Sequence, residues 1–395
     1  MSESTLMPTY ARLDVAFESG QGVWLNDTQG EQYLDAISGI GVCNLGHGHP
    51  AVTEALCGQA KKLIHTSNLY GIPNQQALAD KLIAISGMEK AFIANSGAEA
   101  NEAAIKLARL HGHRKNIELP TIIVAEHSFH GRTMATLTAS GNRKVQAGFE
   151  PLVRGFVRAP FNDIAALENI AKNNTSIAAI LIEPIQGEGG IHIADDEYLR
   201  QVRALCDQHD WLMMLDEIQS GLCRNGKWFT YQHAKCLPDV LTSAKALGNG
   251  MPIGACLVRD KAASLFGPGN HGSTFGGNPL ACKVALEVLN VLEQENLAEQ
   301  ARNRGQYLTN RLNETLQQHE TVKEIRGRGL MMGVELNYPC GHLVQDALDA
   351  KLLINVTAER VIRLLPPLII SEQECDIIAD TLAKIIPQRQ DAGAA

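Results

Sequence analysis

The sequence lacks the features of secreted, membrane-spanning and nucleic-acid-binding proteins. It contains no long basic run, and 43 Asp and Glu residues outnumber 35 Lys and Arg residues, giving a formal net charge of −8 at pH 7. This balance disfavours nucleic acid and anionic membranes as partners. No apolar run reaches the roughly 18 residues that suggest a membrane-spanning helix, and the first residues do not have the basic and apolar segments of a signal peptide.

The nine cysteines lack the spacing of a disulfide framework or a zinc site. Their number is odd, they are scattered along the chain, and no Cys-x-x-Cys pair occurs. This distribution is typical of reduced, buried thiols in the cytosol. We therefore expect a cytoplasmic protein without a metal site.

Apolar residues are abundant, and their arrangement predicts the fold class. They make up 45% of the 395 residues, which is enough for a large core. Short apolar runs alternate with helical patterns in the middle of the chain, as in a mostly parallel sheet covered on both faces. The expected strands are 91–95, 121–126, 178–184, 211–217, 240–245 and 254–259.

The two ends of the chain have a different pattern. Residues 13–37 alternate apolar runs with turn signals, as an antiparallel meander does. Long amphipathic helices and short strands follow residue 285. We therefore expect an α/β protein with a large domain at 46–285 and a smaller α+β domain built from residues 1–45 and 286–395.

Two expected strands are followed by side chains that suit a flat, anionic ligand. Their position is relevant because ligands of α/β proteins bind at the carboxyl ends of the strands. Ser96, Gly97 and Ala98 begin a helix, whose free N–H groups can bind phosphate. Phe129 can stack on a ring, and Arg132 can bind a carboxylate. Each segment taken alone also fits a simpler interpretation, a capped helix or a core aromatic beside a surface arginine.

The most specific pattern is an aspartate and a lysine at the ends of successive apolar runs. Asp216 ends one run and Lys245 the next. A buried carboxylate needs a cationic partner, and a desolvated lysine becomes a nucleophile. The pair suits an imine-forming cofactor whose ring nitrogen needs a counter-charge. Glu183 and Glu188, at a strand end in a Gly-rich loop, also suggest a site. This segment alone leaves open whether they bind a metal, hold an arginine or do acid–base chemistry. The loop at 271–279 fits either phosphate binding or a flexible turn.

Together these motifs resemble the class III (ω-amine) aminotransferases, which are pyridoxal-phosphate-dependent enzymes of fold type I. The resemblance covers essentially the whole chain. Its most specific motifs are LDEIQSG, SAKALGNGMPIGA and HGSTFGGNPLAC.

The resemblance implies a role for each candidate residue. Lys245 would bind pyridoxal 5'-phosphate covalently and move a proton during catalysis, and Asp216 would pair with the ring nitrogen. The other cofactor contacts that it implies are Phe129 on the ring, Gln219 at the phenolic oxygen, and Ser96, Gly97 and Ala98 at the phosphate. Thr274, together with Ser273, would reach the site of a neighbouring subunit, which implies a homodimer. Arg132 and Arg363 would bind substrate carboxylates, with Glu188 able to neutralise Arg363.

Within this class, SGIGVCNLGHGHP and HTSNLYGIPNQQALADKL are most similar to the members that transfer the δ-amino group of N2-acetylornithine to 2-oxoglutarate, in arginine biosynthesis. Ile40 is aliphatic where members that use free ornithine tend to have an aromatic residue, which leaves room for an acyl group. Succinylornithine, succinyldiaminopimelate, ornithine and 4-aminobutyrate stay open as donors. A Rossmann dehydrogenase is disfavoured, because no Gly-x-Gly-x-x-Gly follows the first strand.

Overall fold

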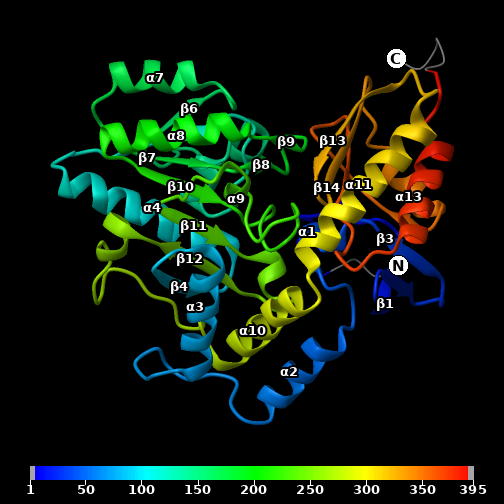
Figure 1. The fold of residues 1–395 in the computed structure, drawn as a ribbon, viewed down its shortest axis with the longest axis horizontal. Coiled ribbons are helices and arrows are strands. Elements are labelled where there is room, and N and C mark those ends of the chain that lie inside the picture. Colours follow the sequence, from blue (N-terminus) through cyan, green and yellow to red (C-terminus); the bar gives the residue numbers. More distant parts are fainter. Residues whose placement is uncertain (1–4, 390–395) are drawn as a thin grey trace.

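A seven-stranded sheet forms the centre of the larger part of the molecule (Figure 1). The computed structural model describes residues 5–389. The strand order is β4-β12-β11-β10-β7-β5-β6, and neighbouring strands are parallel except where β12 pairs with β4 and β11. The strands are β4 (Lys90–Ala94), β5 (Thr121–Ala125), β6 (Phe156–Ala159), β7 (Ile177–Ile182), β10 (Leu212–Asp216), β11 (Val240–Ser243) and β12 (Gly254–Val258).

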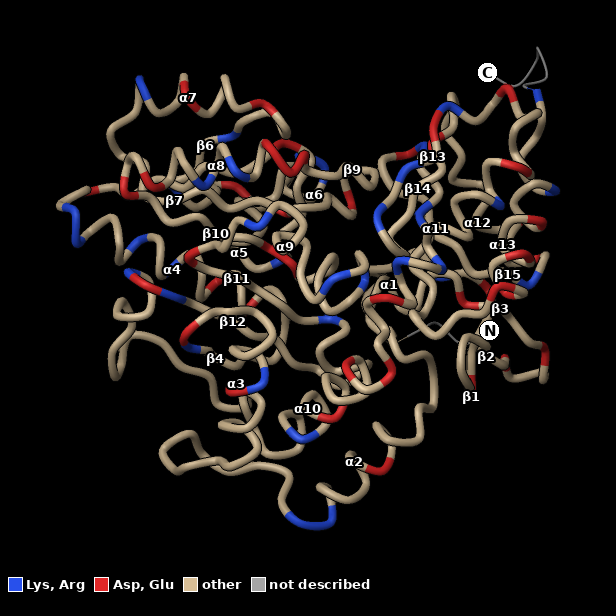
Figure 2. Tube along the Cα trace, viewed as in Figure 1, with Lys and Arg blue, Asp and Glu red and all other residues tan. Residues whose placement is uncertain are grey.

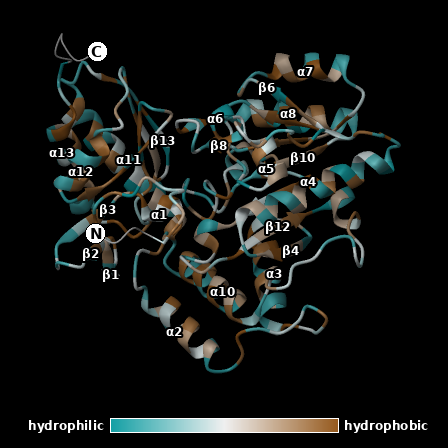
Figure 3. Cartoon of the chain, turned by 180° about the vertical axis from the view of Figure 1, so that it is seen from behind, coloured by the Kyte–Doolittle hydropathy of each residue, from teal (hydrophilic) through white to brown (hydrophobic). Residues whose placement is uncertain are grey.

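Both faces of this sheet are buried, which explains why its strands are continuous apolar runs. In β7, Ala179 and Leu181 pack in one core with the alanines of helix α4, whereas Ile180 and Ile182 pack in a second core with helices α8 and α10. In Figure 3 strands β4 and β12 and helix α10 are largely hydrophobic. The helices of this part are α2 (Pro50–Ala60), α3 (Pro73–Ser86), α4 (Gly97–Arg114), α5 (Met134–Ala139), α6 (Arg143–Gln146), α7 (Ile164–Asn173), α8 (Asp196–His209), α9 (Tyr231–Ala234) and α10 (Pro279–Gln294).

Short elements connect these strands and helices at the edge of the sheet where its parallel strands end. The hairpin of β8 (Ile185–Gln186) and β9 (His192–Ile193) follows β7, and the 3₁₀ turn η1 (Lys245–Leu247) follows β11. A second 3₁₀ turn, η2 (Asp260–Ser264), follows β12 at the opposite edge of the sheet, because β12 is antiparallel to β11 and ends beside its first residue.

The smaller part of the molecule combines both ends of the chain, and Figure 1 shows blue and orange-to-red elements side by side. One sheet has the order β1-β2-β3-β15 and the other β13-β14-β17-β16. Trp24 Nε1 donates a hydrogen bond to Glu374 Oε1 at 3.0 Å and so joins β2 to α13. The elements are β1 (Phe17–Gln21), β2 (Trp24–Asp27), β3 (Gln32–Asp35), α1 (Ser38–Gly41), α11 (Leu297–Leu316), β13 (Val322–Arg328), β14 (Met331–Leu336), α12 (Leu343–Asp349), β15 (Leu352–Leu353), β16 (Asn355–Thr357), β17 (Val361–Leu364) and α13 (Glu372–Ile385).

The expected fold class is confirmed, and each expected strand of the large sheet is present with its ends shifted by one or two residues. Strands β6 and β13 were not expected. Both are edge strands, and β13 carries charged side chains, such as Arg326, that pair with Glu335 on β14 and obscure its apolar pattern. Figure 2 shows charges of both signs on both parts of the molecule. Helix α10 runs through residue 285, and the domain boundaries at 45 and 285 stay predictions.

Candidate active site

A cavity of about 390 Å³ lies where the parallel strands of the large sheet end. Its volume lies within the range of small-molecule sites. The candidate residues that line it come from four different strand ends and are Ser96, Gly97, Ala98, Phe129, Arg132, Asp216, Gln219 and Lys245. The fold therefore brings most of the candidate residues to one place.

Lys245 lies in this cavity with a free amine. Its backbone has a φ of 43°, a left-handed conformation that is unusual for a residue other than glycine. Within residues 5–389 its ammonium has no hydrogen-bond or ion-pair partner. Burial lowers the pKa of Lys245 from 10.5 to about 8, although Glu188 acts against this shift. The uncharged share of the amine near neutral pH, although a minority, is therefore far larger than for a lysine with the ordinary pKa, and the uncharged amine is the nucleophile.

Asp216 is held by two side chains that bond to the same oxygen. Its Oδ2 accepts hydrogen bonds from Asn101 Nδ2 at 2.7 Å and from His130 Nδ1 at 2.8 Å. Asn101 is itself fixed by Thr242, whose hydroxyl donates to Asn101 Oδ1 at 2.8 Å. Among the described residues, Oδ1 of Asp216 accepts one hydrogen bond, from the backbone N–H of Ile218 at 3.1 Å, and so remains available to a cation in the cavity.

His130 and Glu183 complete a buried group of ionisable side chains around Asp216. Burial lowers the pKa of His130, but its hydrogen bond to Asp216 and the charge of that carboxylate outweigh burial and raise the pKa. Burial raises the pKa of Glu183 to about 7. Glu183 Oε1 accepts the backbone N–H of Phe129 at 2.8 Å and so fixes the loop that carries the aromatic ring.

The start of helix α4 forms one wall of the cavity. Ser96 caps the helix, since its hydroxyl accepts the N–H of Glu99 at 3.2 Å. The N–H groups of Gly97 and Ala98 belong to the first turn, which has no intrahelical acceptors for them. A Cβ on Gly97 would lie 2.7 Å from a methyl carbon of Ile218, so only glycine allows this close approach. The wall is therefore suited to a phosphate group.

Phe129 and Arg132 lie at one side of the same cavity. The guanidinium of Arg132 is 5.6 Å from the centre of the Phe129 ring, within the range of a cation–π contact. Arg132 is exposed and has no ion-pair partner within the described residues. Its planar fork is therefore free to bind a carboxylate that enters the cavity.

Arg363 differs from Arg132 because it is buried and paired. Its Nη1 is 2.5 Å from Glu188 Oε1 and 3.3 Å from Gln219 Oε1. Burial alone would raise the pKa of Glu188, but the charge of Arg363 outweighs this and the pKa is lowered. A Cβ on Gly187 would lie 2.0 Å from Gln219 Oε1, so the glycine before Glu188 leaves room for this amide. Neither Arg363 nor Glu188 lines the cavity, but Arg363 contacts Gln219, which does. One guanidinium without an ion-pair partner in the described residues thus lines the cavity, and one neutralised guanidinium lies behind Gln219.

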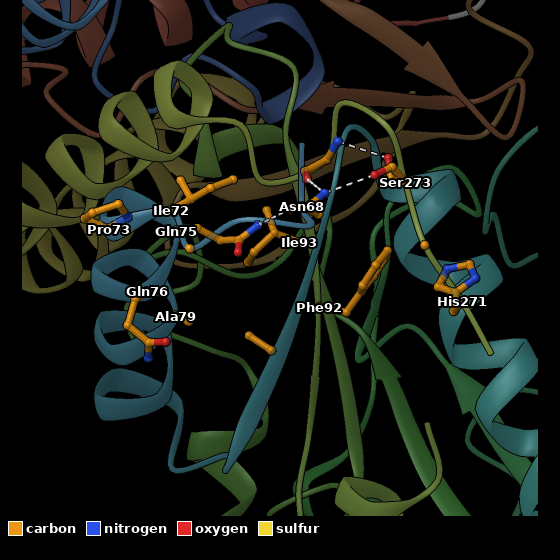
Figure 4. A pocket seen from close by; sticks show the side chains of 14 residues that line it. Asn68, Ile72, Pro73, Gln75, Gln76, Ala79, Phe92, Ile93, His271 and Ser273 are labelled. Atoms are coloured by element: carbon orange, nitrogen blue, oxygen red, sulfur yellow. Dashed lines mark hydrogen bonds between the residues drawn. The ribbon is translucent and has the colours of Figure 1, made fainter. Parts of the chain in front are cut away.

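Ser273 and Thr274 do not line this cavity. Ser273 lies beside a second cavity, of about 680 Å³, between the start of α3 and the loop that follows His271 (Figure 4). Its hydroxyl accepts a hydrogen bond from Asn95 Nδ2 at 3.0 Å, and Asn95 lines the first cavity. Thr274 is exposed. That these two residues serve a neighbouring subunit stays a prediction.

Sequence reasoning missed Asn101 and His130 as parts of the site, whereas it noted Glu183 as a candidate without a definite role. Asn101 has a recognisable signal, because it is a polar residue with 0% exposure among the buried alanines of α4, and a buried amide needs partners. His130 has no comparable signal, because its contact with Asp216 joins residues 86 positions apart.

Residues 5–389 contain neither a metal-binding cluster nor a membrane-spanning helix. Between residues 5 and 389 no group of three or more His, Cys, Asp or Glu side chains is arranged to hold a metal ion. None of the helices in this range is both long and apolar enough to cross a membrane.

Comparison with known proteins gives matches along the whole chain. The family model named aminotransferase class-III matches residues 7–386. A relative from Nitrosomonas europaea, named acetylornithine aminotransferase, is 56% identical over 383 residues, which cover 97% of this chain and 98% of the relative. An ornithine aminotransferase structure from Toxoplasma gondii, with partial occupancy of PLP at its active site, has a TM-score of 0.92 at 34% identity. The match covers 97% of this chain and 92% of the Toxoplasma chain. The structure of the N-acetylornithine aminotransferase of Stenotrophomonas maltophilia has a TM-score of 0.84 at 36% identity. This match covers 95% of this chain and 96% of the Stenotrophomonas chain.

Proposed function

We propose, since the chain belongs to the class III aminotransferases, that it transfers the δ-amino group of N2-acetylornithine to 2-oxoglutarate. The products are N-acetylglutamate 5-semialdehyde and glutamate, and the reaction belongs to arginine biosynthesis. The identity of 56% with the acetylornithine aminotransferase of Nitrosomonas europaea supports this substrate. The observation in the site that carries the proposal is the presence of one free guanidinium, Arg132, and one neutralised guanidinium, Arg363.

The family depends on pyridoxal phosphate, and the residues of the cavity fit this cofactor. The start of α4 offers N–H groups to a phosphate, and Phe129 offers a ring face for stacking. Asp216 would pair with a cationic ring nitrogen through Oδ1, and Lys245 would offer an amine that has no partner within residues 5–389. Pyridoxal phosphate, when bound, supplies a carbonyl carbon that reacts with amines and a ring that accepts negative charge.

The side chains of the site have separate tasks in this reaction. The amine of Lys245, with its pKa lowered to about 8, accepts and returns the proton of the substrate carbon that bears the amino group. Asp216 would stabilise a positive charge at the ring nitrogen, with its carboxylate held in place by Asn101 and His130. Phe129 and the backbone of α4 hold the flat ring and the phosphate while these transfers occur.

The two guanidinium groups explain how one site accepts substrates with different charges. Acetylornithine has one carboxylate and an amine arm, whereas 2-oxoglutarate has two carboxylates. Arg132 binds one carboxylate in both half-reactions. Glu188 neutralises Arg363 while the amine donor is bound and releases it for the second carboxylate of 2-oxoglutarate. Such a change requires different affinities of the two ligands for the two arrangements.

The selectivity of the site for its amino donor depends on the turn Ser38–Gly41. Four successive residues there have positive φ angles, from 46° at Ser38 to 73° at Gly41. The Cβ of a side chain at Gly41 would lie 3.7 Å from Gln219 Cγ, so the turn lies close to the site. Ile40, in this turn, is aliphatic and offers no partner to a free ammonium group. An acylated donor is therefore preferred to ornithine.

We further propose that the active enzyme is a cytoplasmic homodimer with a site shared between its subunits. The loop that carries Thr274 packs against the segment 63–70, since the rings of His65 and Phe275 are 5.4 Å apart. This region exposes several large apolar side chains, namely Leu63, Ile64, Leu69, Tyr70 and Phe275. Such a patch is typical of a protein–protein interface, and a partner there would receive Thr274.

Rates measured side by side on several donors test the proposed substrate. With 2-oxoglutarate as acceptor, kcat/KM is expected to be highest for acetylornithine and at least about tenfold lower for ornithine, a difference of about 1.4 kcal/mol. Succinylornithine, succinyldiaminopimelate and 4-aminobutyrate complete the series. A higher kcat/KM for free ornithine than for acetylornithine would contradict the proposal.

A further inference from the structure

Asn355 contacts the guanidinium of Arg363 on the side away from Glu188. The two residues are paired in the register of β16 and β17. Asn355 Oδ1 accepts hydrogen bonds from Nε of Arg363 at 3.1 Å and from Nη2 at 2.7 Å. Because a guanidinium only donates hydrogen bonds, the atom that receives both of them must be the amide oxygen.

This contact fixes Arg363 without neutralising it. One edge of the guanidinium, Nε and Nη2, is held by a neutral amide, while Nη1 bonds to Glu188 and Gln219. A carboxylate at position 355 would form a permanent ion pair at this edge. The amide therefore leaves the charge of Arg363 available whenever Glu188 moves away.

Strand β16 also holds the backbone of Glu188. Thr357 lies two residues after Asn355, and side chains two positions apart in a strand lie on the same face. The hydroxyl of Thr357 donates a hydrogen bond to the backbone carbonyl of Glu188. Glu188 can therefore release Arg363 by rotating its side chain while its backbone stays in place.

We propose that Asn355 is a positioning residue that keeps the guanidinium of Arg363 in place for the second carboxylate of a dicarboxylate substrate. The inference rests on the proposed function, because it assumes that Arg363 binds a carboxylate of 2-oxoglutarate. Its consequence is that Asn355 determines the preference of the site for dicarboxylates over monocarboxylates and has little effect on ligands with one carboxylate.

Binding of two unreactive acids to the holoenzyme tests this inference without measuring turnover. Glutarate has two carboxylates and pentanoate has one, on chains of equal length. Their dissociation constants are to be measured by titration calorimetry for the wild type, Asn355→Asp and Asn355→Ala. Asn337→Asp, at an exposed position, adds the same charge elsewhere and is the matched control.

We expect Asn355→Asp to weaken glutarate binding by at least about tenfold, which is typical for loss of one charge pair, and to change pentanoate binding by less than roughly twofold. Asn355→Ala keeps the charge and loses the two hydrogen bonds, so it should weaken glutarate binding by a smaller factor. Asn337→Asp should change neither constant.

A wild-type ratio of the two dissociation constants in both Asn355 variants, or an equal loss for both acids, would overturn the positioning role. So would a wild-type enzyme that does not distinguish glutarate from pentanoate. Failure of the wild type to use acetylornithine would instead contradict the proposed substrate, because the binding ratio does not depend on the donor.

Discussion

Oδ2 of Asp216 lies 2.8 Å from Nδ1 of His130, and both side chains are almost fully buried. Asn101 donates to the same oxygen, so both side-chain donors bond to Oδ2, whereas Oδ1 accepts the backbone N–H of Ile218. Nε2 of His130 is buried and has no hydrogen-bond partner in the described part of the chain. This arrangement keeps the carboxylate of Asp216, which lines the cavity, in one orientation.

Replacement of Asp216 tests its pairing with the ring nitrogen. Asp216→Ala should hold pyridoxal phosphate more weakly and lose most turnover, because a ring without a protonated nitrogen is a poor electron acceptor. Each tenfold loss in kcat corresponds to about 1.4 kcal/mol. Cofactor content by absorbance and kcat measure the two effects, with exposed Asp349→Asn as control. Wild-type rates in Asp216→Ala would mean that another group faces the nitrogen.

Asn101→Ala should affect stability as well as activity. The substitution removes a donor from Asp216 and leaves the hydroxyl of Thr242 without its acceptor. Loss of partners by buried polar groups costs about 1–3 kcal/mol each. Urea unfolding of the apoprotein should show a destabilisation of this order, whereas Asn337→Ala should change the free energy of unfolding by less than about 0.5 kcal/mol. Equal stability of both variants would mean that water replaces the Asn101 amide.

The sequence predicts most of this site because its residues follow strand ends, and parallel strand ends meet at one edge of a sheet. Lys245, Asp216 and Phe129 are examples, and the cavity contains all three. Contacts between parts far apart in the chain carry no local pattern. Asn355 is such a case, because its role depends on the register of β16 with β17. Edge strand β13 was missed because its charged side chains pair with the next strand.

Glu188→Ala should affect the two half-reactions unequally. Without Glu188, Arg363 is charged and unpaired while the amine donor binds, which disfavours acetylornithine but not 2-oxoglutarate. We expect the rate of the acetylornithine half-reaction to fall at least about tenfold and that of the 2-oxoglutarate half-reaction to stay near the wild-type rate. Glutamate should also become a better donor, since Arg363 is then free for its second carboxylate. Single-turnover kinetics measure each half, and equal losses in both would reduce Glu188 to a structural role.

The lowered pKa of Lys245 predicts its reactivity in the apoprotein. Below its pKa of about 8 the amine is protonated and unreactive, and above it the amine is free. Reductive labelling with pyridoxal phosphate and borohydride, followed by peptide mass spectrometry, should give a midpoint near pH 8 for Lys245. The exposed Lys62 serves as the internal comparison for a lysine outside the cavity. Labelling of Lys245 without a midpoint near pH 8 would mean that burial does not activate this amine.

The central claim is that Lys245 carries the cofactor of a transaminase that uses acetylornithine, and formation of glutamate from acetylornithine and 2-oxoglutarate tests it most directly. The assay compares the wild type with Lys245→Ala, with pyridoxal phosphate added in excess to both proteins. The wild type should form glutamate. Lys245→Ala should form it at least about a hundredfold more slowly, since loss of a general acid–base group typically lowers the rate by that factor. Circular dichroism should show that the variant keeps its fold. Glutamate formation by Lys245→Ala at the wild-type rate, or none by the wild type, would contradict the account.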